Sequence, residues 1–260
     1  MHTEEKNGLR LLRFGVFKGL PGLDCAVATR QGGVSTGPYA GLNLGSGTGD
    51  KIENVEANLE LFCAALGAEP ARLGRMRQRH TANVAVLEAG GGTPPDNTDA
   101  LVTSAQGLPL LALSADCALT VFYDPAHKAL AVIHSGWRGA LLDVYGAALA
   151  AMRLHYGTEP ADVVAGVSPM ISAAHYPVKE DFLKKLQAFY PGGADKHFLT
   201  MKEGRHFFNL RELLRLRLEA LGVGKYEFMH LCTYAEKEMF YSWRRDGEKT
   251  GRFGLLALLT

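Results

Sequence analysis

Two histidines and one cysteine are the residues of this sequence whose types and spacing best suit catalysis. His80, Cys117 and His134 each lie at or near the end of a segment expected to be a strand, and a sheet whose strands end on one side would bring them together. Two imidazoles and a thiolate suit Zn²⁺, and three protein ligands leave the fourth tetrahedral position free for water or substrate. Bound zinc would lower the pKa of that water to about 7, which is the chemistry of a catalytic site.

Spacing alone leaves other interpretations of these residues open. Cys117 and a histidine could form a thiolate nucleophile with its general base and need no metal. A buried cysteine is also a common core residue. A non-catalytic binding module with a structural zinc ion is a further alternative, although structural zinc normally has four protein ligands and this set offers three. Activity that survives chelation would favour the metal-free enzyme, and unfolding on metal removal would favour the structural site.

A second feature follows His134 directly, where Gly136 to Gly139 joins an expected strand to an expected helix. Backbone N–H groups at a helix N-terminus attract anions, and the glycines let a ligand approach closely. Arg138 could hold a phosphate or carboxylate with two hydrogen bonds, whereas the simpler alternative is a solvated arginine beside a packing Trp137. In another basic pattern, arginines alternate along an expected strand and could form a basic stripe, although a solvated face is the favoured interpretation: Arg75, Arg77 and Arg79.

Hydrophobic periodicity places these residues among short strands and amphipathic helices. The pattern predicts helices over 52–66, 139–156, 179–189 and 209–221. It predicts strands over 25–29, 83–87, 99–103, 108–114, 119–123, 129–134, 162–167, 226–232 and 253–259. Strands clustered in the middle with helices around them predict an α+β fold of mixed β-sheets layered with helices. The Gly- and Pro-rich run 89–97 has strand-like segments close on both sides, so we expect a surface loop within a single domain of residues 1–260.

Composition excludes several functional classes. The chain of 260 residues is 47% hydrophobic, and its 28 Lys and Arg against 27 Asp and Glu give a net charge of +1. This balance provides no overall basic field for holding nucleic acid. The four cysteines are widely spaced, which fits a reducing cytosol, and no apolar stretch approaches the ~20 residues of a membrane helix. We therefore expect a cytoplasmic protein with no nucleic-acid or membrane partner, and no protein partner is predicted.

Several motifs, in order along nearly the whole chain, resemble those of the laccase-domain or "multicopper polyphenol oxidase" family. This family includes the peptidoglycan-editing factor and proteins now described as purine nucleoside phosphorylases. The matching blocks are Thr29 to Ser35, Gly37 to Tyr39, Leu42 to Gly45, Gly49-Asp50, Asn58, Asp99-Ala100, Ala115 to Cys117, His134 to Gly139, Cys232-Thr233, Tyr241 to Gly247 and Thr250 to Arg252. Several motifs in the family's order are far more specific than any one of them alone.

The resemblance implies a zinc site made by His80, Cys117 and His134, within a four-layered αββα-like sandwich. It also implies phosphorolysis of purine nucleosides (inosine, adenosine or guanosine) to the base and ribose 1-phosphate, with adenosine deamination and methylthioadenosine phosphorolysis as further activities. The older family name implies copper and phenol oxidation. Multicopper centres, however, rely on paired His-x-His ligands, and none of the nine histidines forms such a pair. The peptidoglycan-editing relatives suggest another alternative, a Cys117–histidine hydrolase that acts on an amide of an aberrant cell-wall precursor.

The sequence departs from the family pattern at positions close to the proposed ligands. The family usually has glycine at the position of Thr81, proline at Leu119, alanine at Ser135, glycine at Ser168, cysteine at Met170 and tyrosine at Trp243. None of these residues is a proposed ligand. The departures therefore bear on substrate preference rather than on the metal site.

Phosphorolysis requires a group that holds phosphate near C1′ of the nucleoside while the purine leaves through an oxocarbenium-like sugar. We hypothesise that Arg30, Arg138 and the backbone of Gly136 to Gly139 hold phosphate, with Trp137 in the same substrate site. Asn43 could bind the ribose hydroxyls, or it could only shape a Gly-rich turn. The expected partners are purine nucleosides and phosphate.

Asp116 is the candidate general acid or base because it precedes Cys117 directly. Neighbouring side chains in a regular strand point to opposite faces, so the two residues share a site only if the strand ends between them. The alternative role for Asp116 is to accept a hydrogen bond from a ligating imidazole.

Overall fold

Two six-stranded sheets packed face to face form the centre of the molecule. The computed structural model describes residues 1–89 and 94–260, so residues 90–93 of the expected loop at 89–97 lie outside the described residues. The first sheet has the order β1-β2-β3-β15-β7-β4, with strands His2–Lys6, Leu9–Arg13, Leu23–Ala28, Phe253–Leu259, Leu110–Ser114 and Gly74–Arg75. The second has the order β14-β10-β8-β9-β6-β5, with strands Lys225–Phe228, Val164–Val167, Ala118–Asp124, Ala129–Ser135, Ala100–Thr103 and Val84–Val86.

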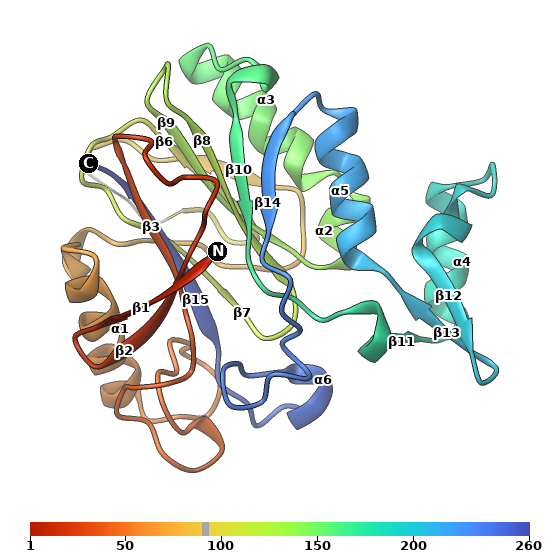
Figure 1. Ribbon diagram of the computed structural model, residues 1–260, viewed down its shortest axis with the longest axis horizontal. Coiled ribbons are helices and arrows are strands. Elements are labelled where there is room, and N and C mark those ends of the chain that lie inside the picture. Colours follow the sequence, from red (N-terminus) through yellow and green to blue (C-terminus); the bar gives the residue numbers. More distant parts are fainter. Residues whose placement is uncertain (90–93) are drawn as a thin grey trace.

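Helices cover the outer faces of both sheets and complete four layers (Figure 1). Helix α1 (Ile52–Ala65) packs on the first sheet, and α2 (Trp137–Leu141), α3 (Val144–Tyr156) and α5 (Leu210–Ala220) pack on the second. A side lobe projects from the sandwich in Figure 1 and contains α4 (Glu180–Phe189) with a small sheet of β11 (Pro177–Val178), β13 (Arg205–Phe208) and β12 (Leu199–Lys202). The short helix α6 (Trp243–Asp246) follows β14 and precedes β15 along the chain. The expected αββα-like sandwich of mixed sheets is confirmed.

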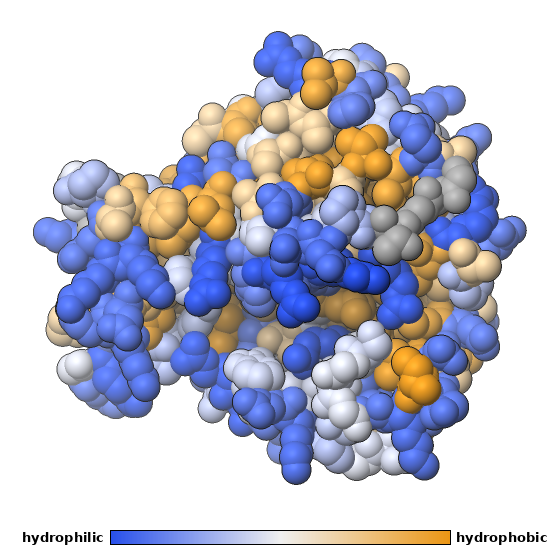
Figure 2. All heavy atoms as spheres, turned by 180° about the vertical axis from the view of Figure 1, so that it is seen from behind, coloured by the Kyte–Doolittle hydropathy of each residue, from blue (hydrophilic) through white to orange (hydrophobic). Residues whose placement is uncertain are grey.

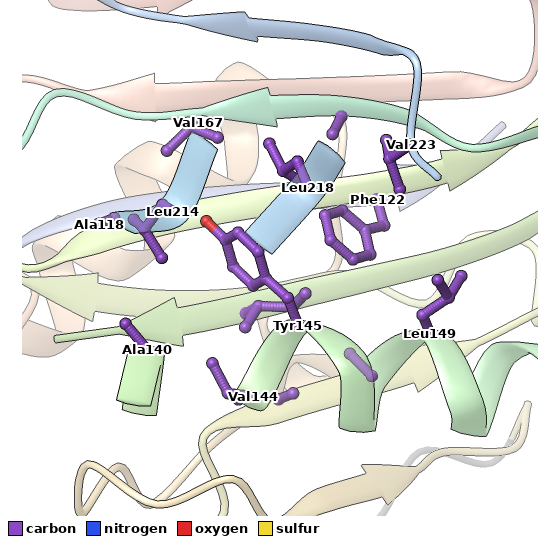
Figure 3. Packing of buried hydrophobic residues seen from close by; sticks show 14 of the residues in the cluster. Ala118, Phe122, Ala140, Val144, Tyr145, Leu149, Val167, Leu214, Leu218 and Val223 are labelled. Carbon is purple, nitrogen blue, oxygen red and sulfur yellow. The ribbon is translucent and has the colours of Figure 1, made fainter. Parts of the chain in front are cut away.

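Alternating side chains of the central strands explain why the layers stack in this order. In β8, Leu119 and Val121 belong to the cluster between the sheets, whereas Ala118 and Phe122 face the helices. Figure 3 shows Tyr145 extending from α3 into this helical layer among Phe122, Leu214 and Leu218. Its hydroxyl pairs with Thr120 Oγ1 at 2.5 Å, so the one polar atom of this buried ring is hydrogen-bonded.

The structure divides the helix predicted over 139–156 into α2 and α3. Asp143 adopts a left-handed φ of 61°, which interrupts the α-helical backbone. Its side chain then accepts a hydrogen bond from Gly146 N and caps the start of α3. An amphipathic pattern that runs through both segments does not reveal such a break.

Hydrophilic side chains cover most of the face seen in Figure 2, and hydrophobic ones gather in smaller patches between them. Among the residues described, no helix is both long and apolar enough to cross a membrane.

The pairing of β6, β9 and β8 fixes the position of three chemically active residues. Leu119 pairs with His134 across β8 and β9, and Ala100 pairs with Ile133 across β6 and β9. Cys117 immediately precedes β8, and Asp99 immediately precedes β6. The start of two strands and the end of the antiparallel strand between them therefore meet at one edge of the second sheet.

Candidate metal centre

The structure brings the three predicted ligands together. The ligand atoms of His80, Cys117 and His134 all lie within 4.8 Å of one another. Cys117 Sγ is 3.8 Å from His80 Nε2, and the two imidazole rings are 5.0 Å apart between centroids. His134 comes from the end of β9, Cys117 from the turn before β8, and His80 from the loop between β4 and β5, where its φ of 62° is left-handed.

Asp99 positions two of these ligands, His80 and His134, although the spacing of residues along the sequence does not reveal this role. Its Oδ1 accepts hydrogen bonds from His80 N at 3.0 Å and from His134 Nδ1 at 2.9 Å. Its Oδ2 accepts from Arg79 N, Thr81 N and Thr81 Oγ1 at 2.8–3.0 Å. A carboxylate on Nδ1 leaves Nε2 of His134 as the free ligand atom, the usual support for a metal-binding histidine.

Because Gly136 has no side chain, two of the three ligands, Cys117 and His80, can occupy the space beside it. A Cβ atom built on this residue would lie 2.7 Å from Cys117 Sγ and 2.8 Å from His80 Cδ2. Its φ of −82° and ψ of −177° are open to any residue, so the backbone does not require glycine. The absence of a side chain at this position is therefore a requirement of the site.

The environment of Cys117 favours the thiolate, which is the charge state that binds a metal ion, and it keeps a proton on His134 that a bound metal ion would displace. Burial raises the pKa of the Cys117 thiol, but His134 and His80 lower it more, to about 6. Burial lowers the pKa of His134, but hydrogen bonds to Asp99 and Cys117 raise it to about 9. In metal-free protein at neutral pH, a thiolate thus faces an imidazolium, and a metal cation would replace that proton.

The low pKa of Cys117 predicts alkylation of this thiol by iodoacetamide in metal-free protein. Modification of Cys117 should proceed at neutral pH with a midpoint near 6, because the thiolate is the nucleophile. Burial raises the pKa of Cys63 to about 11 and also raises that of Cys25, so both should stay unmodified. Peptide mass spectrometry over a pH series would measure this, with Cys117→Ala as the control. A rate that rises only above about pH 8, the range of an ordinary thiol, would contradict the prediction.

The three ligands lie in a cavity of about 940 Å³ with a cationic and aromatic lining. Five arginines line it: Arg75, Arg77, Arg79, Arg244 and Arg252. Three aromatic side chains also line it: Trp137, Tyr176 and Trp243. Only two acids, Asp96 and Asp116, accompany them among the described lining residues. A cavity of this size, with several rings and an excess of guanidinium groups, suits a small anionic or phosphate-using ligand with a flat ring.

Asp116 shares this cavity with Cys117, because both lie in the turn between β7 and β8. Its backbone has a left-handed φ of 108°, and its carboxylate is already engaged. Oδ1 accepts from Thr233 Oγ1 at 2.7 Å, and Oδ2 accepts from Arg244 N at 2.7 Å. These contacts attach the C-terminal segment to the turn that carries Cys117.

Of the predicted substrate-binding residues, the structure places Trp137 in the cavity lining and three others outside it. Asn43 is fully buried, and its Oδ1 accepts a hydrogen bond at 2.8 Å from the backbone N–H of Arg252. Arg138 is exposed and lies 5.1 Å from the ring centroid of Trp137. Arg30 lies over Tyr241 and lines a different cavity. Asn43 and Arg138 thus support residues that line the cavity.

The fold and this site together define an αββα sandwich protein with a His–Cys–His group at the strand ends that could hold a metal ion. The chain belongs to the family described as multi-copper polyphenol oxidoreductase laccase, whose profile matches residues 24–260. It is 34% identical over 256 residues to a purine nucleoside phosphorylase of Bacteroides thetaiotaomicron, with 94% of each chain covered. It is 37% identical over 224 residues to a purine nucleoside phosphorylase of Streptomyces coelicolor, covering 86% of this chain and 90% of the relative. The crystal structure of Bacillus licheniformis hypothetical protein YfiH superposes with a TM-score of 0.88 at 28% identity, with 99% of each chain covered.

Proposed function

We propose that this protein is a zinc-dependent phosphorylase of purine nucleosides, such as inosine, adenosine or guanosine. The observation that carries the proposal is the His80–Cys117–His134 group within a cavity lined by arginines and aromatic rings. The relatives named purine nucleoside phosphorylase, which match most of the chain, support it. The substrates are accordingly a purine nucleoside and orthophosphate, and the proposed location is the cytoplasm, where thiols stay reduced.

The donor set fits a zinc ion. His80 and His134 would supply imidazole nitrogens and Cys117 a thiolate, with Asp99 fixing the orientation of His134. Zinc bound there would act as a Lewis acid toward an oxygen or nitrogen atom of a ligand in the open position. Gly136 keeps the space around Cys117 and His80 free for the ion.

Arg244 and Arg252 are the best-placed residues to hold orthophosphate. The backbone N–H of Arg244 donates to Asp116 beside Cys117, and its guanidinium donates to Pro177 O at 2.9 Å. The guanidinium of Arg252 donates to Thr250 O and Gly251 O at 2.8 and 2.9 Å. Both groups keep further N–H donors for a phosphate, and their backbone acceptors fix their orientation in advance. A phosphate oxygen attacks C1′, the C1′–N bond breaks, and the purine leaves with the bonding electrons and takes up a proton.

The aromatic rings of the cavity would hold the flat purine by stacking. Trp243 is the most accessible of them, with 45% of its surface exposed. The contacts of Asp116 support a positioning role for its carboxylate, and its acid–base role stays a prediction. Asn43 acts in this proposal through the backbone of Arg252 rather than on the substrate, and Arg30, which lines a different cavity, has no role in it.

Phosphate-dependent release of the base from inosine, adenosine and methylthioadenosine tests the proposal. We expect release by metal-loaded protein with phosphate, loss of release after chelation, and recovery on adding zinc. The matched control is Cys117→Ala, which removes one ligand from the group and should not recover. Metal analysis of the purified protein reports the ion independently of turnover.

Parallel assays of the same purified protein separate the alternative functions. Hydrolysis of a cell-wall amide that survives chelation and stops on thiol alkylation would replace the phosphorylase with a Cys117–histidine hydrolase. Stoichiometric copper with phenol oxidation would restore the older family activity. Inosine formed from adenosine without phosphate would establish the predicted deamination as an additional activity. Stoichiometric zinc without any nucleoside turnover would overturn the proposed function.

A further inference from the structure

We propose that this cavity accepts purine nucleoside 5′-phosphates as well as the uncharged nucleosides, and that it binds the 5′-phosphates more tightly. The inference rests on the proposed function, because it assigns the nucleoside to the cavity that holds the ligand triad. Its basis is a set of three arginines that line the cavity, Arg75, Arg77 and Arg79, which we call the arginine stripe. Arg244 and Arg252, from the C-terminal part of the chain, line the same cavity.

The backbone of residues 74–79 builds the arginine stripe by strict alternation. Strand β4 pairs in parallel with β7, and Met76 is buried against the core between the sheets. The Gln78 amide continues this pairing, because Nε2 donates to Leu113 O at 2.7 Å and Oε1 accepts from Leu113 N at 2.9 Å. With the even-numbered residues fixed inward, the three arginines between them are exposed and line the cavity.

The charges of the arginine stripe are not neutralised within the protein. Arg77 pairs with Asp96 at 2.6 Å, whereas Arg75 and Arg79 form no ion pair with any side chain that the structure describes. The chain as a whole is nearly neutral, at +1. Five arginines against two acids in one cavity is therefore a local concentration of positive charge.

One orthophosphate ion does not account for this concentration. Arg244 and Arg252, which the proposed function assigns to orthophosphate, are held near Asp116 and Cys117. An uncharged nucleoside would leave Arg75 and Arg79 facing only solvent. A phosphoryl group on the substrate would supply the missing anion, with the two guanidinium groups as its hydrogen-bond donors.

Intrinsic fluorescence gives a direct readout of binding, because the chain has two tryptophans and both line the cavity, Trp137 and Trp243. Zinc-loaded protein would be titrated with adenosine, adenosine 5′-phosphate and orthophosphate alone at low ionic strength. We expect adenosine 5′-phosphate to bind about tenfold more tightly than adenosine, as two exposed ion pairs can provide. The preference should shrink as salt is added.

The decisive variant is Arg75→Ala/Arg79→Ala, in which the ratio of the adenosine Kd to the adenosine 5′-phosphate Kd should fall from about ten to about one. The matched control is Arg153→Ala/Arg205→Ala, which removes the same charge from exposed positions paired with surface glutamates. In this control the preference should persist.

Equal affinity of the wild type for adenosine and its 5′-phosphate would overturn the inference, as would a preference that survives in Arg75→Ala/Arg79→Ala. Complete loss of the preference when saturating orthophosphate is present would also overturn it, because the phosphoryl group would then share the orthophosphate site. Failure of the proposed function gives a different pattern. In that case neither ligand would release a base, while the affinity difference and its dependence on the arginine stripe would remain measurable.

Discussion

Gly136→Ala should produce a folded protein that no longer holds its metal ion. The added methyl group would lie 2.7 Å from Cys117 Sγ and 2.8 Å from His80 Cδ2, closer than van der Waals contact allows. The ends of both side chains must rotate away, so two of the three ligands leave the positions that face His134. Displacement of reacting groups by about 1 Å can cost about a hundredfold in rate, and we expect at least that loss of phosphorolysis.

The same substitution should change the free energy of unfolding by no more than about 2 kcal/mol, because the strain is confined to movable side chains. Metal content by mass spectrometry and the thermal transition of metal-free protein separate the two effects. Gly224→Ala is the matched control, since a Cβ atom there meets nothing within 4 Å. Stoichiometric zinc with wild-type affinity and turnover in Gly136→Ala would refute the assignment of this glycine to the site.

The proximity of Cys117 and His134 could be predicted from the sequence because the strands that carry them have clear apolar patterns, whereas His80 lies in a loop. β8 and β9 are buried along their whole lengths, which gives continuous apolar segments bounded by polar residues. Once such strands are neighbours in one sheet, residues at their adjoining ends must meet. The predicted proximity of Cys117 and His134 needed no knowledge of the loops.

The cavity wall could not be predicted in the same way. It combines residues 45–48 and 75–79 with residues 243, 244 and 252, which spacing along the chain does not relate. Arg30 and Asn43 belong to the family's N-terminal motif, yet Arg30 lines a different cavity, and Asn43 is buried behind this one and holds the backbone of Arg252. The alternation of Arg75, Arg77 and Arg79 is visible in the sequence, but the same pattern is typical of a solvated face and does not show that these residues line a cavity.

The N-terminal hairpin escaped prediction for an electrostatic reason. Strand β1 is mostly charged or polar and half-exposed, so its pattern lacks the apolar alternation of a typical strand. Its pairing with β2 includes ion pairs of Glu4 with Arg13 and of Glu5 with Arg10, at 2.6 and 2.7 Å. These charges are complementary only in the folded register, which the sequence alone does not reveal.

Replacement of Asp99 should weaken both metal binding and the stability of the folded protein. Asp99→Asn is the substitution that tests this. The carboxylate accepts five hydrogen bonds, from His134 Nδ1, His80 N and donors of Arg79 and Thr81. The amide of asparagine keeps one acceptor oxygen and turns an NH₂ group toward N–H groups that are already donors. We expect stability to fall by about 2–4 kcal/mol and zinc affinity to fall by about 10–100-fold.

A control with equal destabilisation distinguishes positioning of the ligands from general loosening. Val121→Ala removes core volume between the sheets, away from the lining of the cavity, and should cost about 2 kcal/mol without changing zinc affinity. Asp96→Asn, close in sequence but exposed, should change stability by less than about 0.5 kcal/mol. The absorption spectrum of cobalt-substituted protein gives a further readout, because a rotated His134 alters the ligand field whereas a looser core does not. If Asp99→Asn bound zinc as tightly as Val121→Ala and gave the same cobalt spectrum, Asp99 would support the loop alone and not the metal centre.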